Sequence, residues 1–242
     1  NVSAIMVDSN KNLWLGYYSG SIKVFNKQGL LVKQFPQINS TVFNIFEDSK
    51  KNIWIGSYSN GLSLFDPESN SFTHYKKDPN NSKSIGSNDV RFIIEDNSGD
   101  LWLSVHGAGL DMFDTQKKEF RHFKTDYSSD YIIFDNWTFP VIEDSFGDIW
   151  VGHSRGLSKL NLENMKFDNY QQHIGDNTSL SHNFVNIIYR SRNGDLWVGT
   201  NEGLNLFDYE NKSFISYFVK DGLPNNSING ILEDRYGNLW IS

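Results

Sequence analysis

The sequence contains no cysteine. Disulfide bonds, zinc–thiolate sites and cysteine nucleophiles are therefore excluded. It also lacks a long apolar run, since no stretch approaches the roughly 18 apolar residues of a membrane span. The chain opens at Asn1 on a strand-like segment without a basic, apolar leader. Either the protein is soluble, or its anchoring and targeting parts lie outside these residues.

A surplus of basic charge is absent as well. The chain has 22 Lys and Arg against 29 Asp and Glu, a formal net charge of −7. Proteins that bind nucleic acid gain affinity largely from basic side chains that displace counterions from phosphates. We therefore expect no nucleic-acid partner. Aromatic residues, in contrast, make up 15% of the sequence, and this enrichment favours β-strands.

Tryptophan recurs at nearly regular intervals. Six of the seven tryptophans follow one another at spacings of 40, 48, 48, 47 and 43 residues: Trp14, Trp54, Trp102, Trp150, Trp197 and Trp240. Each follows an apolar run, a polar turn and Leu or Ile, and precedes an aliphatic residue and usually Gly. Self-similarity at a period of 20 to 50 residues is typical of repeat architectures. The chain therefore consists of copies of one small unit, and we expect the tryptophans to pack between adjacent copies.

Each copy contains four short predicted strands. In the third copy, residues 90–96 and 101–103 are β-rich runs on either side of a polar turn, which indicates a hairpin. Residues 109–114 and 119–123 then alternate apolar and polar side chains with a period of two. Four short antiparallel strands with one aromatic motif per copy are typical of a β-propeller blade. The sequence thus predicts an all-β fold with blades at about 2–35, 42–75, 90–123, 138–170, 185–218 and 228–242.

The last of these blades is cut short, because the chain stops two residues after Trp240. Every earlier copy continues for a further half repeat after its Trp. We therefore expect residues 1–242 to form a single, incomplete propeller of about five blades and the first strands of a sixth.

The acidic pairs of the repeat invite a catalytic or metal-binding interpretation, but turn chemistry explains them better. Pairs such as Glu47-Asp48 and Glu95-Asp96 open the first turn of a copy, where Asp hydrogen-bonds the turn backbone. Residues 96–100 lack the distal Glu and the ligand spacing of a calcium loop. We therefore expect no metal site and no cofactor. The glycines that begin the third strands are expected to need a positive φ: Gly61, Gly109, Gly156 and Gly203.

The repeated phrase resembles the two-component regulator propeller repeat. The resemblance rests on residues 95–103, on copies of them at 144–152 and 194–204, and on the linkers 78–85 and 221–227. Turn, Trp, Gly and linker recur together in this order over essentially the whole chain. Departures are local: Ser104 stands in place of Gly, Tyr17-Tyr18 in place of a Thr-Asn pair, and Arg190-Ser191 in place of Glu-Asp.

That resemblance implies a function for the chain. In that family such repeats form the periplasmic sensor region of bacterial hybrid two-component systems, typically two seven-bladed propellers, a small β-sandwich, a membrane span and a histidine kinase. Many of these sensors detect glycan fragments. The resemblance thus implies a seven-bladed intact ring, an oligosaccharide ligand, the remainder of the same receptor as a partner, and a homodimer of the full receptor. The kinase would lie elsewhere in the protein.

Candidate ligand residues are those that vary inside the otherwise fixed repeat. Variable side chains follow the second strands, and others, including Phe43, Arg91, Phe139 and Asn186, lie near the start of the first strands. Long connections that emerge at the same face are where binding residues concentrate. Aromatic rings with Asn, His and Arg donors suit a sugar, whose ring faces stack and whose hydroxyls need hydrogen bonds. The candidates are Tyr17, Tyr18, Tyr58, Arg91, His106, Trp137, His153 and Asn201.

Several alternatives stay open. For the tyrosines and histidines among these candidates, ordinary loop packing is the alternative to ligand contact. Trp137 is either an exposed platform or a buried plug, and Arg91 either binds an acidic sugar or pairs with a neighbouring carboxylate. An enzyme is a second hypothesis, since propellers also carry glycosidases and lyases, but no singular carboxylate pair stands out. A third hypothesis is a protein-interaction or dimerisation scaffold, which large exposed apolar residues on one face would favour.

Overall fold

The computed structural model describes residues 1–35, 40–125 and 132–242. These residues form two compact units, Asn1–His122 and Phe123–Ser242. Within the described ranges the chain forms five four-stranded antiparallel sheets and one two-stranded sheet, and in each sheet neighbouring strands follow one another along the chain. The predicted all-β fold, an incomplete β-propeller, is confirmed. The assignment of 1–242 to one domain stays a prediction.

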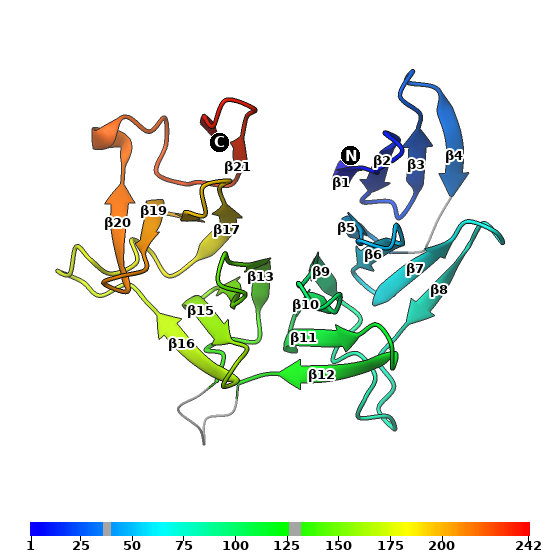
Figure 1. Ribbon diagram of the computed structural model, residues 1–242, viewed down its shortest axis with the longest axis horizontal. Coiled ribbons are helices and arrows are strands. Elements are labelled where there is room, and N and C mark those ends of the chain that lie inside the picture. The colour runs from blue at the N-terminus through cyan, green and yellow to red at the C-terminus, as the bar shows by residue number, and fades with distance from the viewer. Residues whose placement is uncertain (36–39, 126–131) are drawn as a thin grey trace. The chain divides into compact units, whose positions relative to one another are not determined.

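The first unit holds three sheets (Figure 1). Their first strands lie side by side, β1 next to β5 and β5 next to β9. The strands are β1 (Val2–Val7), β2 (Leu13–Tyr17), β3 (Ile22–Phe25) and β4 (Leu31–Phe35), then β5 (Val42–Glu47), β6 (Ile53–Ser57), β7 (Leu62–Asp66) and β8 (Ser71–Tyr75), then β9 (Val90–Glu95), β10 (Leu101–Val105), β11 (Gly109–Asp114) and β12 (Glu119–Phe123).

The second unit repeats this plan. Here β13 lies next to β17, and β17 next to β21. The elements are β13 (Thr138–Glu143), β14 (Ile149–His153), β15 (Gly156–Asn161) and β16 (Lys166–Tyr170), then β17 (Val185–Arg190), β18 (Leu196–Thr200), β19 (Gly203–Asp208) and β20 (Ser213–Tyr217), a short 3-10 helix η1 (Val219–Asp221), and the pair β21 (Ile231–Glu233) and β22 (Leu239–Ile241).

Three of the repeated tryptophans lie between two sheets. Each contacts an aromatic ring on the last strand of its own sheet and a Phe on the third strand of the next. Trp150, for example, stacks on Tyr170 with 5.5 Å between ring centroids and meets the edge of Phe207 at 4.7 Å. Trp14 and Trp54 make the equivalent contacts with Phe65 and Phe113 of the following sheets. Aromatic burial of this kind is a main source of packing energy between the sheets.

For Trp240 the expectation of packing between blades stays a prediction. Its side chain is 65% exposed, because within the described residues no further sheet covers this side of the β21–β22 pair. Trp197 is intermediate: it is half-buried and contacts Tyr217 of its own sheet. Regular spacing in the sequence therefore places the Trp within its strand, whereas its burial depends on the neighbouring sheet.

A hydrogen bond from the indole N–H explains the Asp of each acidic pair. The Asp six residues before the Trp accepts this bond in five copies, at 2.9, 2.8, 2.8, 2.7 and 3.2 Å for Trp14, Trp54, Trp102, Trp150 and Trp240. In the remaining copy Ser191 stands in that place. The second carboxylate oxygen accepts a backbone N–H four residues on, as in the 2.8 Å bond from Asn12 to Asp8. Burial would raise the pKa of Asp8, but the bonds from Trp14 and Asn12 hold it below its usual range.

Three of the Glu residues, Glu47, Glu95 and Glu233, tie their turn to that of the preceding sheet. Glu47 accepts the backbone N–H and the hydroxyl of Ser9, at 2.6 and 2.8 Å, and Glu95 binds Ser49 in the same way. In the second unit Glu233 accepts the backbone N–H of Arg192 at 2.8 Å. These carboxylates are therefore structural, as the turn interpretation predicted.

Glycine is required where two sheets approach closely. A Cβ on Gly152, two residues after Trp150, would lie 2.6 Å from Cγ1 of Val185 on the next sheet. Gly16 and Gly56 meet Val42 of β5 and Val90 of β9 in the same way, and Gly199 meets Ile228, three residues before β21. The positive φ predicted at the start of the third strands is also confirmed, with φ of 67°, 97°, 133° and 126° at Gly61, Gly109, Gly156 and Gly203.

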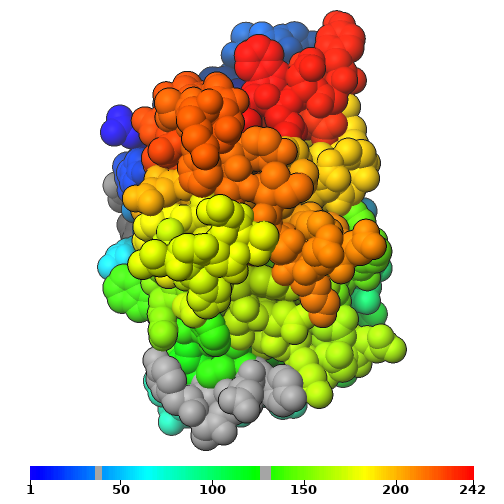
Figure 2. Space-filling model, turned by 90° about the vertical axis from the view of Figure 1, so that its left-hand side faces the viewer, coloured from blue at the N-terminus to red at the C-terminus, as the bar shows by residue number. Residues whose placement is uncertain are grey.

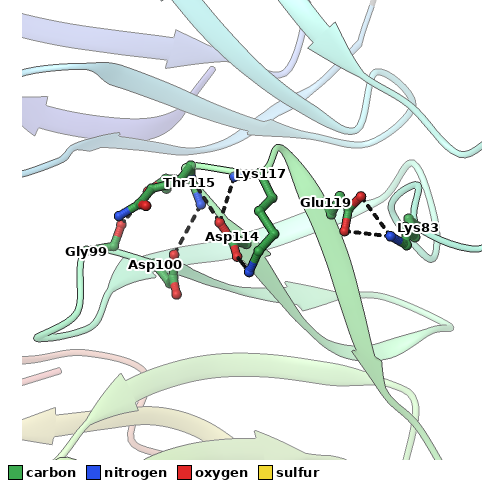
Figure 3. Close-up of polar contacts among 8 residues, drawn as sticks. Lys83, Gly99, Asp100, Asp114, Thr115, Lys117 and Glu119 are labelled. Atoms are coloured by element: carbon green, nitrogen blue, oxygen red, sulfur yellow. Dashed lines mark hydrogen bonds and ion pairs between the residues drawn. The ribbon is translucent and has the colours of Figure 1, made fainter.

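The long linker before β9 is fastened to the third sheet. Figure 3 shows the Lys83 ammonium against both carboxylate oxygens of Glu119 on β12, at 2.8 Å each. The backbone N–H of Phe120 also donates to the carbonyl of Lys83. On the same sheet Thr115 bridges the two turns, since its N–H donates to Asp100 and its hydroxyl to the carbonyl of Gly99. The linker therefore enters β9 from a defined position.

Candidate functional site

A β-bulge marks the start of the first strand in four sheets. The pairing register slips by one residue at Ser3 of β1, Phe43 of β5, Arg91 of β9 and Asn186 of β17. In β13 the irregularity falls between Thr138 and Val141. A bulge leaves its extra residue outside the ladder and re-aims the side chain, which is why bulges are common beside binding sites. The bulged residues are also among those that vary from copy to copy.

The bulges lie beside the residues that follow the second strands. Val42 pairs with Ser57 and Val90 with Val105, so that Phe43 and Arg91 are next to the loops that begin with Tyr58 and His106. Within each unit, the structure thus brings the variable residues at the start of the first strands next to those that follow the second strands.

In the first unit four of these side chains form one cluster, which we call the aromatic–arginine cluster: Phe43, Tyr58, Asp89 and Arg91. The guanidinium of Arg91 lies 4.0 Å from the centroid of the Phe43 ring. Its Nε and Nη2 donate to the two carboxylate oxygens of Asp89, at 2.6 and 2.8 Å. The edge of Tyr58 meets Phe43 with 6.4 Å between centroids, and Tyr58 is 58% exposed. The cluster offers a planar cation, a tyrosine ring and hydrogen-bond donors at one surface.

Other predicted residues of the first unit lie around this cluster. Tyr18 is exposed, and its carbonyl accepts the hydroxyl of Thr41, whose own carbonyl accepts the N–H of Tyr58. The backbone N–H of His106 donates to the carbonyl of Asp89 at 2.8 Å. Tyr17 is half-buried at the end of β2, with the Lys23 ammonium 5.8 Å from its ring.

The second unit carries a different set of groups at its bulges. The Asn186 amide donates to the side-chain oxygen of Asn201 at 2.9 Å and to the carbonyl of Ile228 at 3.1 Å. Phe139 packs against Phe184, with 5.2 Å between ring centroids. Trp137 is 57% exposed, and its backbone N–H donates to Asp135. Of the two alternatives for Trp137, the exposed platform matches the structure.

His153 is a core residue, which corrects its place among the ligand candidates. Its side chain is fully buried at the end of β14, where Nε2 is 2.9 Å from the hydroxyl of Ser158 and Nδ1 accepts the backbone N–H of Arg155. Burial lowers the pKa of His153 to about 4. The His153 side chain is buried because it occupies the last position of β14. Tyr58 and His106 come one residue after the ends of β6 and β10 and therefore lie in the loops.

Asp89 is the member of the cluster that sequence reasoning missed. The available signal was an acid two residues before Arg91, at the end of a linker, beside the first residue of a predicted strand. Of the two alternatives for Arg91, pairing with a neighbouring carboxylate is the one observed.

A further hollow of about 420 Å³ lies in the second unit, between the linker that follows β16 and the β20–η1 segment. Figure 2 shows this linker, in yellow, beside the orange segment that contains β20 and η1. Gln172, His173, Asp176, Phe218 and Lys220 contribute to its lining. Among the residues that the structure describes, no three acidic or histidine side chains are grouped closely enough to hold a metal ion. Nor does that part of the chain include a helix long and apolar enough to cross a membrane.

Three segments of the sequence match a known family of repeats, in agreement with the repeated sheets. Residues 36–59, 179–202 and 222–242 match the family model of the two component regulator propeller. These three segments, together less than half of the chain, resemble repeats of that family. No curated protein sequence gives a match.

Solved structures of similar fold cover 99% to 100% of this chain. The extracellular domain of a putative hybrid two component system from B. thetaiotaomicron is 22% identical over 99% of this chain, with a TM-score of 0.73. Virginiamycin B lyase from Staphylococcus aureus is 13% identical over the full chain with a TM-score of 0.76, and the type-IX secretion component PorZ of Porphyromonas gingivalis 16% identical with a TM-score of 0.74. This chain spans 38%, 77% and 37% of those three chains. At these identities the likeness establishes the fold.

Proposed function

We propose that these residues form the ligand-sensing part of an extracytoplasmic two-component receptor. Two findings support this: the family of the repeat, and the similarity to the extracellular domain of a hybrid two component system. We place the sensor in the periplasm and its output in a histidine kinase elsewhere in the same protein, acting as a homodimer. A ligand shifts such a receptor only through its different affinities for the two signalling states.

The ligand we propose is an oligosaccharide, and the aromatic–arginine cluster is the observation that carries this proposal. Sugars are bound by aromatic rings that stack on their apolar faces and by side chains that satisfy their hydroxyls. Tyr58 supplies an exposed ring, and the Arg91 guanidinium, 4.0 Å from the centroid of the Phe43 ring, supplies hydrogen-bond donors beside it. Bulges and long connections hold these groups on a rigid sheet, which limits the ordering cost of binding.

Replacing Tyr58 by Ala tests this site. Because the ring is mostly exposed, we expect little change in stability, but a loss of affinity for the bound glycan of about tenfold, from the lost stacking. Calorimetry of the intact protein with a panel of glycan fragments provides the measurement. The matched control is Tyr236→Ala, which removes another mostly exposed tyrosine, from the turn between β21 and β22. Equal effects of the two substitutions would show that binding lies elsewhere.

Catalysis is the weaker alternative. Virginiamycin B lyase demonstrates that a similar fold carries an enzyme, but at 13% identity this concerns the fold alone. The repeated carboxylates Asp48, Glu47 and Glu95 are engaged in turn hydrogen bonds. We propose that this part of the protein binds its ligand without transforming it.

The exposed face of the first sheet favours an additional role in docking. Ile5 and Val7 are exposed there, beside a hollow lined by Leu13, Leu15 and Phe25. The equivalent residues of the second sheet, Ile53, Ile55 and Phe65, are buried in a cluster with Trp14 and Phe35 of the sheet before them. The occupant we propose is therefore another sheet of the same repeat.

Thiol labelling distinguishes a covered face from an open one, since these 242 residues contain no cysteine. In the intact protein, Ile5→Cys is expected to react about tenfold more slowly than Thr73→Cys on the exposed side of β8, because a docked sheet must open first. Equal rates would contradict docking at this face.

A further inference from the structure

The ion pair inside the aromatic–arginine cluster has a consequence for the charge of the ligand. Asp89 occupies the Nε–Nη2 edge of Arg91, one of the two edges of a guanidinium that can bind a carboxylate with two parallel hydrogen bonds. Phe43 covers one face of the same guanidinium. The N–H groups of Arg91 that do not bind Asp89 can still donate hydrogen bonds to a ligand, and a hydroxyl oxygen is a suitable acceptor.

The ion pair between Arg91 and Asp89 is largely shielded from water. The side chain of Asp89 is 11% exposed and that of Arg91 is 25% exposed. Charges in such surroundings interact more strongly than they do at an open surface, because less water screens them. The two formal charges of the cluster cancel, so an approaching anion meets a paired cation and, within about 3 Å of it, a carboxylate of its own sign.

We propose that Asp89 determines specificity at this site by holding Arg91 in the ion pair, so that the cluster binds an uncharged saccharide in preference to one that contains uronic acid. This inference rests on the proposed function. An acidic saccharide would have to displace Asp89 from Arg91, which loses charge-assisted hydrogen bonds, or leave its own carboxylate beside that of Asp89, which brings two like charges together.

Substitution of Asp89 by Asn tests the proposal. Asn has nearly the same shape and can still accept one hydrogen bond from Arg91, but it no longer neutralises the guanidinium. The affinities of the intact protein for a neutral oligosaccharide and for a uronic-acid oligosaccharide of the same length are measured by calorimetry. The unsubstituted protein should favour the neutral ligand, and D89N should raise the ratio of acidic to neutral affinity on the order of tenfold.

Two further variants control the experiment. Asp66→Asn removes one negative charge from the turn between β7 and β8 and should leave the ratio unchanged, which separates a local effect from net charge. Arg91→Gln leaves Asp89 without its cation and should move the ratio the other way, against the acidic ligand. This second variant keeps the proposal testable if D89N does not fold.

The outcomes separate this inference from the proposed function. If saccharides bind but D89N and R91Q leave the ratio unchanged, or if the unsubstituted protein prefers the acidic ligand, the role of Asp89 is overturned while saccharide sensing stands. If no saccharide of either class binds to the unsubstituted protein or to any variant, the proposed function falls and the inference falls with it.

Discussion

Replacing Trp150 by Ala is expected to lower the free energy of unfolding of the second unit by about 3–5 kcal/mol, the range for removing a large buried aromatic side chain. Trp150 is fully buried between Tyr170 and Phe207, and the substitution leaves a cavity that the sheets on either side can only partly fill. It also removes the indole N–H from Asp144, whose buried carboxylate loses a partner.

Trp240→Ala is the matched control. This residue occupies the same position of the repeat and donates to the equivalent Asp234, but it is mostly exposed. In a chain limited to residues 1–242, its replacement should change the unfolding free energy by no more than about 0.5 kcal/mol. Urea unfolding followed by circular dichroism compares the two. Similar losses for both would show that the Asp–Trp hydrogen bond, rather than burial between sheets, is the main contribution.

The second large effect is a loss of stability in acid through His153. In the unfolded chain an imidazole takes up a proton near pH 6.5, whereas burial lowers the pKa of His153 in the fold to about 4. Between these values the unfolded state binds more protons, so stability falls as the pH falls. At about 1.4 kcal/mol per pKa unit, roughly 3 kcal/mol is lost from above pH 6.5 to below pH 4.

His153→Gln should remove this part of the pH dependence, since Gln can hydrogen-bond Ser158 but does not titrate. The measurement is the urea unfolding free energy at several values between pH 7 and pH 4. His173→Gln, at an exposed position of the linker after β16, should leave the profile unchanged. An identical pH profile for the unsubstituted protein and H153Q would contradict the assigned pKa.

Local patterns predicted most of the fold. Strands such as Val42–Glu47 were predictable because alternation, polar turns and glycine are properties of adjacent residues. The Asp–Trp bond left a readable signal too, a constant spacing of six residues in five copies. Its meaning was hidden, because the sequence does not show that a hairpin turn brings the carboxylate under the indole.

The candidate site was predictable only in part. Arg91 and Tyr58 could be selected because they vary within the repeat, and Phe43 was noted for the same reason. Their mutual contacts depend on two neighbouring sheets and on a bulge in each first strand. The burial of His153 depends on a difference of one residue between the strand end and the loop, which is finer than sequence patterns resolve.

The sequence by itself determined the repeat, the strands, the turns and the tryptophan positions, because each of these follows from side chains that are neighbours along the chain. Only the tertiary structure decided which tryptophans are buried, that Asp89 holds Arg91, and that His153 belongs to the core. Those outcomes depend on the packing of one sheet against the next, and contacts between residues about 50 positions apart are encoded in no local pattern.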